Sequence, residues 1–243
     1  MAFEKEQGPA RLEIATAAAA PPAAAPFRGY FRPEDIAADR WVHLAALVLC
    51  TTGIPVLLDL AGRSGHRAVF FACGVYAVTL VTLFACSTAL YHVPLHIERR
   101  RLRQFDHAAI YLLIAGTCTP FTTALLPGDA AMAITSLVWA GAITGAVHKL
   151  TRPLPFPGFS TAGYLLIAGT VLISLVPTLS AIDPLSLILI IAGLAIYGAG
   201  TVLRTRRSLR YRNTIWHSMV TTAATCHYAA ILHGVVLASG GLR

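Results

Sequence analysis

Residues 87–120 set the pattern for the whole chain: Ser-Thr-Ala-Leu-Tyr-His at 87–92, an arginine-rich loop, and Phe-Asp-His-Ala-Ala-Ile-Tyr-Leu-Leu-Ile-Ala-Gly-Thr-Cys-Thr-Pro at 105–120. His92 stands where one apolar segment ends, and Asp106 stands where the next begins. Ionisable side chains at segment ends on one side of a membrane lie at similar depth, so we expect these two to meet. His217, at the start of the last apolar segment, is the third member that we expect there.

The composition is that of a polytopic membrane protein. The 243 residues are 56% hydrophobic and only 12% charged, with a mean hydropathy of +0.66, whereas soluble domains carry far more charge. The net charge of +8 points less to nucleic acid than to a bilayer, because most arginines lie in short loops between apolar runs. We therefore expect membrane lipid, and no nucleic acid, as the partner. The oligomeric state is left open.

Residues 1–39 differ in composition from residues 40–243. The first stretch is rich in alanine and proline and has too little apolar surface to form a core, which predicts a disordered cytoplasmic tail. It does not read as a signal peptide, because glutamates stand where a basic region is required. Pro33-Glu34-Asp35-Ile36 is a possible start of a short interfacial helix, since acidic groups favour a first turn.

Residues 40–243 form the predicted membrane domain. A hydrocarbon core about 30 Å thick needs roughly 20 apolar residues of helix. Seven segments satisfy this length: 41–61, 68–92, 106–126, 130–148, 159–180, 185–203 and 214–238. The predicted fold is all-α, a bundle of seven transmembrane helices. Small residues at 192–200 are expected to allow close helix packing, and His227 to be a hydrogen-bonded interior histidine.

The basic residues orient this bundle. The tail and the second, fourth and sixth loops hold 16 lysines and arginines, and the other side holds the remaining 3, Arg63, Arg67 and Arg243. The excess of positive charge marks the cytoplasmic side, which puts the N-terminus in the cytoplasm and the C-terminus outside. His92, Asp106 and His217 then all lie near the cytoplasmic boundary.

These three residues are the parts of a zinc site. A single histidine near a membrane interface is ordinary, because it reaches water easily. Two imidazoles and a carboxylate that converge from three helices are less common than a single histidine. They match a zinc centre with an open position, in which the metal lowers the pKa of a bound water and the carboxylate orients it.

The motifs at 87–92 and 105–120, with Ile-Trp-His and Cys-His-Tyr within 215–228, resemble the bacterial hemolysin III family. That family is related to the progestin and adipoQ (adiponectin) receptors and, more distantly, to the alkaline ceramidases. The resemblance implies seven helices in the bacterial inner membrane and a zinc ion near the cytoplasmic face. In the family, one histidine of the second helix and an H-x-x-x-H pair of the seventh hold the zinc, and an aspartate of the third holds the metal-bound water.

Carried over to this chain, the resemblance makes His92 the second-helix ligand, Asp106 the water-holding aspartate and His217 the second histidine of the pair. The first histidine of the pair falls on Asn213, which shares a helix face with His217 but offers only a neutral carbonyl oxygen. Zinc occupancy is therefore less secure than in the family. Three cytoplasmic-side histidines are alternatives for the missing ligand: His43, His96 and His148.

The family also places a serine one helical turn before the second-helix histidine. Here that position is Thr88, with Ser87 beside it. A hydroxyl on this face has two possible roles: donating to a developing oxyanion, or bonding to its own helix backbone.

Two functions follow. The first is a zinc-dependent hydrolase that cleaves a lipid amide or ester, with Asp106 as general base and Thr88 or Ser87 at the oxyanion. The alternative is a non-enzymatic sensor or receptor-like protein, or a cytolysin, with a degenerate metal site. Against a pore, no span carries a sustained polar stripe. A retinal protein is not expected, because the seventh span lacks a lysine.

Overall fold

In a computed structural model, the described residues are 33–93, 100–151, 176–206 and 208–240, with several positions between 163 and 173. The α-helices are α1 (Pro33–Arg63), α2 (Arg67–His92), α3 (Arg100–Leu125), α4 (Gly128–Thr151), α6 (Pro184–Thr205) and α7 (Arg212–Ile231). A 3₁₀-helix, η1 (Val176–Ala181), precedes α6, and a π-helix, η2 (Leu232–Leu237), continues α7. No strand occurs among these residues, so the predicted all-α class is confirmed.

Six helices are long and apolar enough to cross a membrane: α1 from Asp35, α2, α3, α4, α6, and α7 together with η2. They coincide with six of the seven predicted spans. The fifth, at 159–180, lies largely outside the described residues, although its described positions from 163 to 173 are helical. The predicted tail lies outside them as far as residue 32.

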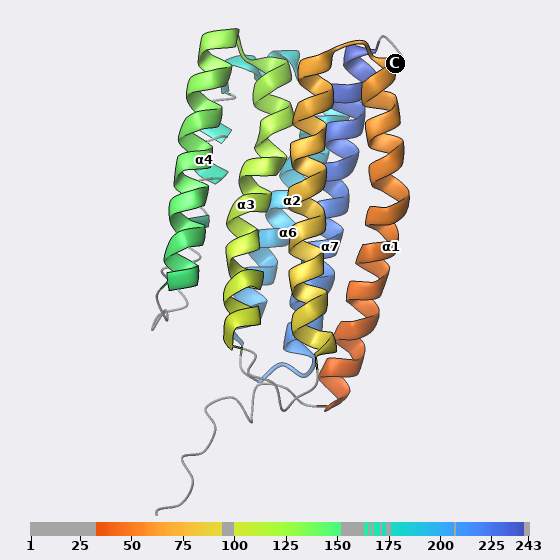
Figure 1. The fold of residues 1–243 in the computed structure, drawn as a ribbon, viewed down its shortest axis with the longest axis vertical. Coiled ribbons are helices and arrows are strands. Elements are labelled where there is room, and N and C mark those ends of the chain that lie inside the picture. The colour runs from red at the N-terminus through yellow and green to blue at the C-terminus, as the bar shows by residue number, and fades with distance from the viewer. Residues whose placement is uncertain are drawn as a thin grey trace, which may run out of the picture. The chain divides into compact units, whose positions relative to one another are not determined.

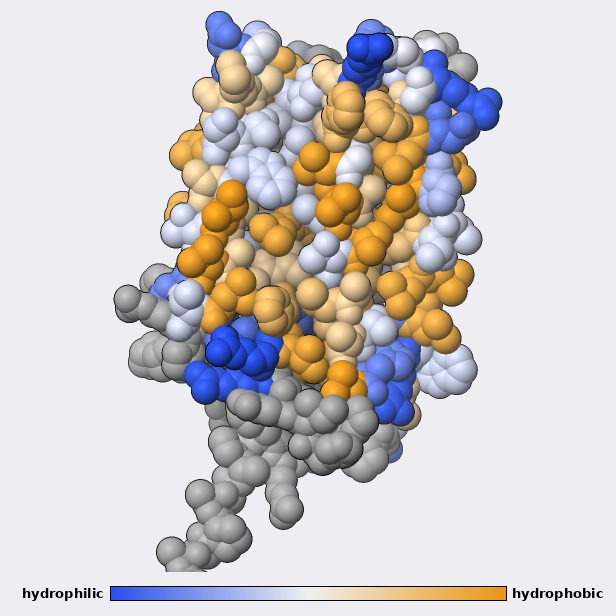
Figure 2. Space-filling view, viewed as in Figure 1, coloured by the Kyte–Doolittle hydropathy of each residue, from blue (hydrophilic) through white to orange (hydrophobic). Residues whose placement is uncertain are grey.

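The lateral surface of the bundle is apolar. Large side chains such as Trp41, Phe71 and Met132 are exposed on it. In Figure 2 hydrophobic residues fill the middle of the visible face, and hydrophilic ones gather toward its two ends. Such a surface is a liability in water, but acyl chains cover it in a bilayer. The molecule is therefore a polytopic membrane protein.

Consecutive helices run in opposite directions and pack against their neighbours. Helix α1 packs on α2 and α7, α3 packs on α2 and α4, and α6 packs on α7 (Figure 1). The starts of α1, α3 and α7 therefore lie at the same end of the bundle as the end of α2. We call this the site end. It is the lower end of the helices in Figure 1.

Small residues allow the close helix contacts. A Cβ atom at Gly116 of α3 would overlap the Thr79 side chain of α2. In the sixth helix, a Cβ at Gly200 would stand 3.1 Å from the Trp216 ring of α7. The expected packing role of the small residues at 192–200 is thus seen at Gly200. His227 is buried, with Nε2 3.4 Å from the Ile190 carbonyl oxygen, as expected for an interior histidine.

The first helix begins earlier than the apolar pattern predicts. Residues 33–39, which composition assigns to the tail, form the first two turns of α1. A proline at the first helical position is favourable, because its missing N–H would find no helical partner there. Ile36, one turn on, is buried and anchors this extension to the bundle. The extension brings Asp39 to the site end.

Candidate functional site

Ser87 of α2 and Asp106 of α3 form one part of the site. The Ser87 hydroxyl donates a short hydrogen bond to Asp106 Oδ1, and both side chains are buried. The close α2–α3 packing at Gly116 brings the two helices near enough for this contact. The serine therefore serves the aspartate rather than its own helix backbone, and it fixes one carboxylate oxygen.

Thr88, the next residue, has a different environment. Its Oγ1 is buried and has no hydrogen-bond partner among the described residues. Thr82 on the same helix shows the ordinary alternative, because its hydroxyl donates to the Val78 carbonyl at 2.8 Å. Thr88 thus keeps a hydroxyl that is free to donate to a ligand.

His217 of α7 pairs with a carboxylate of α1. Its Nδ1 lies 3.0 Å from Asp39 Oδ1, and both side chains are buried. Because a carboxylate accepts, Nδ1 is the protonated nitrogen and Nε2 keeps its lone pair. Asp106 is close enough for its charge to act on His217. Asp39 of α1 is thus the direct partner of His217, and Asp106 of α3 acts on it electrostatically.

His43, one turn after Asp39 on α1, lies against His217. Their ring centroids are 4.6 Å apart, and His43 also stacks on Tyr91 at 5.1 Å. Its side chain is 1% exposed, and neither ring nitrogen has a hydrogen-bond partner among the described residues. The Asp39 backbone lies close to the ring, but its carbonyl oxygen falls outside hydrogen-bond geometry. An unpaired buried imidazole costs free energy, so this ring is placed to receive a partner.

Asn213 lies where the sequence predicts, one turn before His217 on α7. It is 4% exposed and shares the inward face of α7 with that histidine.

His92 ends α2, and its side chain is exposed. Its Nδ1 lies 2.9 Å from the Thr88 carbonyl oxygen, so this nitrogen is the donor and Nε2 keeps its lone pair. A shallow depression beside it is lined by Arg40, Trp41 and Leu44 of α1. His92 therefore lies at the site end, at the rim rather than in the buried cluster.

The donor atoms at the site end suit a divalent metal. Imidazole nitrogen and carboxylate oxygen are ligands that zinc accepts, and neither ring nitrogen of His43 has a hydrogen-bond partner among the described residues. In the described part of the chain, Asp39 contacts His217 and Asp106 contacts Ser87. Over the same residues, no three His, Cys, Asp or Glu side chains are already grouped as a complete ligand set. The chemistry of these donor atoms nevertheless fits a metal.

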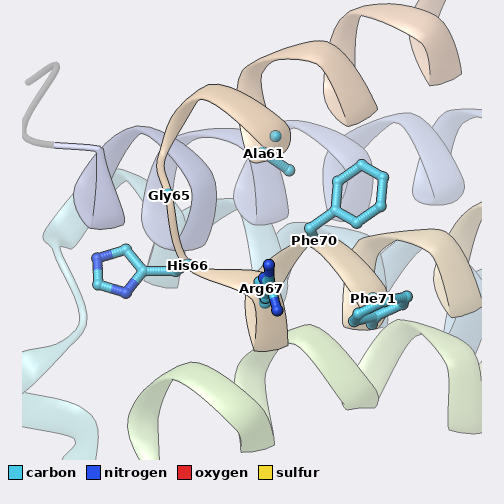
Figure 3. Close-up of a pocket in the computed structure, with 7 residues that line it drawn as sticks. Ala61, Gly65, His66, Arg67, Phe70 and Phe71 are labelled. Atoms are coloured by element: carbon cyan, nitrogen blue, oxygen red, sulfur yellow. The ribbon is translucent and has the colours of Figure 1, made fainter.

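A second depression lies at the opposite end of α1. Figure 3 shows His66 and Arg67 at the turn between α1 and α2, followed by Phe70 and Phe71 on α2. This hollow holds no carboxylate and lies about 30 Å of helix away from Asp39. It takes no part in the site.

The sequence did not identify Asp39 as a site residue, because composition assigned it to the tail. It indicated His43 only as one of three substitutes, of which His96 lies outside the described residues. One signal was available: Asp39 and His43 stand four residues apart, which puts them on one face of any helix that contains both.

The sequence is similar to those of known proteins over most of its length. Residues 37–228 match the model of a family described as Haemolysin-III related. The chain is 27% identical to Hemolysin-3 from Bacillus cereus over 206 residues, which cover 85% of this chain and 94% of the relative. It is 26% identical to a Hemolysin-3 homolog from Bacillus subtilis (strain 168) over 202 residues, which cover 83% and 95%. No solved structure matches the chain.

Proposed function

The chain belongs to the haemolysin-III-related family, and from this premise we propose that it is a metal-dependent hydrolase that cleaves an amide or ester bond of a membrane lipid. It is an integral membrane protein, as its apolar helices require, and the bacterial relatives indicate the plasma membrane. One observation carries the proposal. Asp106 is buried, held by Ser87 and close to His217, at the end of the bundle that the charge pattern assigns to the cytoplasm.

His92 and His217 would hold zinc, together with the position of Asn213. When bound, the ion lowers the pKa of a water molecule and polarises the scissile carbonyl group. Both histidines have Nδ1 engaged by an oxygen atom, and this leaves Nε2 as the ligand atom in each. Metal-binding histidines in proteins commonly have such a partner.

Asp106 acts as the general base. It accepts a proton from the attacking water as the oxygen of that water bonds to the carbonyl carbon. The same proton passes to the leaving nitrogen or oxygen when the scissile bond breaks, which releases a fatty acid and an amine or alcohol. Ser87 holds the carboxylate in place, and Thr88 donates its hydroxyl to the oxyanion that develops.

The surroundings favour a lipid substrate. The face of α1 beside His92 carries apolar side chains, and Trp41 is 72% exposed there. A lipid is able to approach this face sideways, with its acyl chain in the bilayer and its polar bond at the level of the site end.

The test is hydrolysis of fluorescent lipid amides and esters by the purified protein in phospholipid vesicles. Asp106→Asn removes the base and is expected to lower the rate by about 10²-fold or more. Asp59→Asn is the matched control, because Asp59 pairs with Arg63 on the exposed surface near the opposite end of α1. Equal rates in the parent and Asp106→Asn would refute the assigned role of Asp106.

A non-enzymatic membrane protein is the second candidate. Asn213 favours it, because a weak donor at a ligand position is what loss of catalysis would leave. The name of the Bacillus cereus relative, Hemolysin-3, also suggests a cytolysin. Leakage of dye from vesicles that contain the protein, with no lipid hydrolysed, would support that alternative.

A further inference from the structure

Helix α1 brings two groups to the site end that the family pattern does not require. Asp39 and His43 are 0% and 1% exposed. They stand one turn apart on the face of α1 that packs on α7, and both approach His217. A carboxylate and an imidazole buried this deeply within a membrane protein are costly unless they bind something.

His43 has a free lone pair whichever tautomer it adopts. Neither ring nitrogen has a hydrogen-bond partner among the described residues, and a neutral imidazole always has one unprotonated nitrogen. A water molecule or a cation would satisfy that nitrogen. Asp39 and Asp106 lie near these imidazoles, and carboxylate oxygens beside imidazole nitrogens form the kind of donor set that a divalent cation accepts.

His92 and His217 also each have a ring nitrogen available for a cation. The Nδ1 atoms of His92 and His217 are 2.9 Å and 3.0 Å from an acceptor oxygen, so each ring keeps Nε2 for a metal. Asn213, although buried beside His217, has no imidazole to offer. The imidazoles of His43, His92 and His217 come from α1, α2 and α7, respectively.

We propose that His43 supplies the imidazole that Asn213 lacks, so that the nitrogen ligands of the metal are His43, His92 and His217. The inference rests on the proposed metal site but not on hydrolysis. Asp39 is then a positioning residue, because it fixes the tautomer and orientation of His217. One ligand has moved from α7 to α1, and the metal joins three helices.

Zinc content of the full-length protein purified in detergent tests this assignment. The variants are His43→Gln and the double variant His43→Gln with Asn213→His, and His66→Gln in the opposite turn is the matched control. We expect zinc in His43→Gln to fall to about one tenth of the parent value or less. His66→Gln should retain the parent's zinc. The double variant should regain it, because histidine at 213 rebuilds the pair with His217.

Zinc binding regained by the double variant would show that His43→Gln loses a ligand and does not misfold. Zinc retained in His43→Gln, or a double variant that does not regain zinc, would overturn the assignment of His43. A parent protein without zinc would overturn both this inference and the proposed function. A parent that holds zinc through His43 but hydrolyses no lipid would refute the hydrolase and leave the ligand assignment standing.

Discussion

Two adjacent hydroxyl groups on α2 have different roles. The Ser87 hydroxyl donates its hydrogen bond to Asp106, whereas the Thr88 hydroxyl is buried and has no hydrogen-bond partner among the described residues. The family pattern alone did not distinguish them, because it only placed a hydroxyl one turn before His92. In the proposed mechanism Ser87 therefore positions the base, and Thr88 donates to the oxyanion.

Thr88→Val tests this division, because valine keeps the shape of threonine and removes the hydroxyl. We expect kcat for lipid hydrolysis to fall by about 10²-fold with little change in KM, since an oxyanion donor acts mainly in the transition state. Thr82→Val is the control, because that hydroxyl bonds to its own helix backbone. Equal loss in both variants would mean that Thr88 has no special role.

The buried site was only partly predictable from the sequence. Spacing put Asn213 and His217 on one helix face, and the ends of the spans put Asp106 near His217. The Asp39–His217 contact joins residues 178 positions apart, and no local sequence pattern predicts a contact between residues so far apart. Whether a histidine turns inward also depends on packing, as the exposed His92 and the buried His43 show.

At the scale of helices, the spacing of α2 and α3 sets the Ser87–Asp106 contact. Gly116→Val would place a side chain against Thr79 and force these helices apart. We expect a loss of about 1–3 kcal/mol in unfolding free energy, seen as a lower thermal midpoint in detergent. Gly74→Val on α2 is the control, because a Cβ there meets nothing within 4 Å. An unchanged midpoint for Gly116→Val would contradict the close α2–α3 packing.

The extent of the helices was predictable where bilayer thickness determines it. Six predicted spans were found because apolar length is a strong signal. The sequence marks Pro33 as a possible start of a short interfacial helix, and α1 does begin there. The continuation of these polar turns into the first span depends on tertiary contacts such as that of Ile36. Apolar length does not record such contacts.

At the scale of the molecule, the uneven distribution of basic residues predicts a cytoplasmic site end. Single cysteines at exposed His66 and Ser208 test it in cells, in a background without the five native cysteines. A membrane-impermeant maleimide should label His66→Cys in intact cells and Ser208→Cys only after permeabilisation. The reverse pattern would place the site end outside the cell.

The most direct test of the central claim is metal dependence of lipid hydrolysis by the parent protein in vesicles. We expect a zinc chelator to abolish hydrolysis and about one equivalent of Zn²⁺ per chain to restore it, since the ion would activate the attacking water. Hydrolysis that continues unchanged after the metal is removed would contradict the account. So would the absence of hydrolysis from protein shown to be fully loaded with zinc.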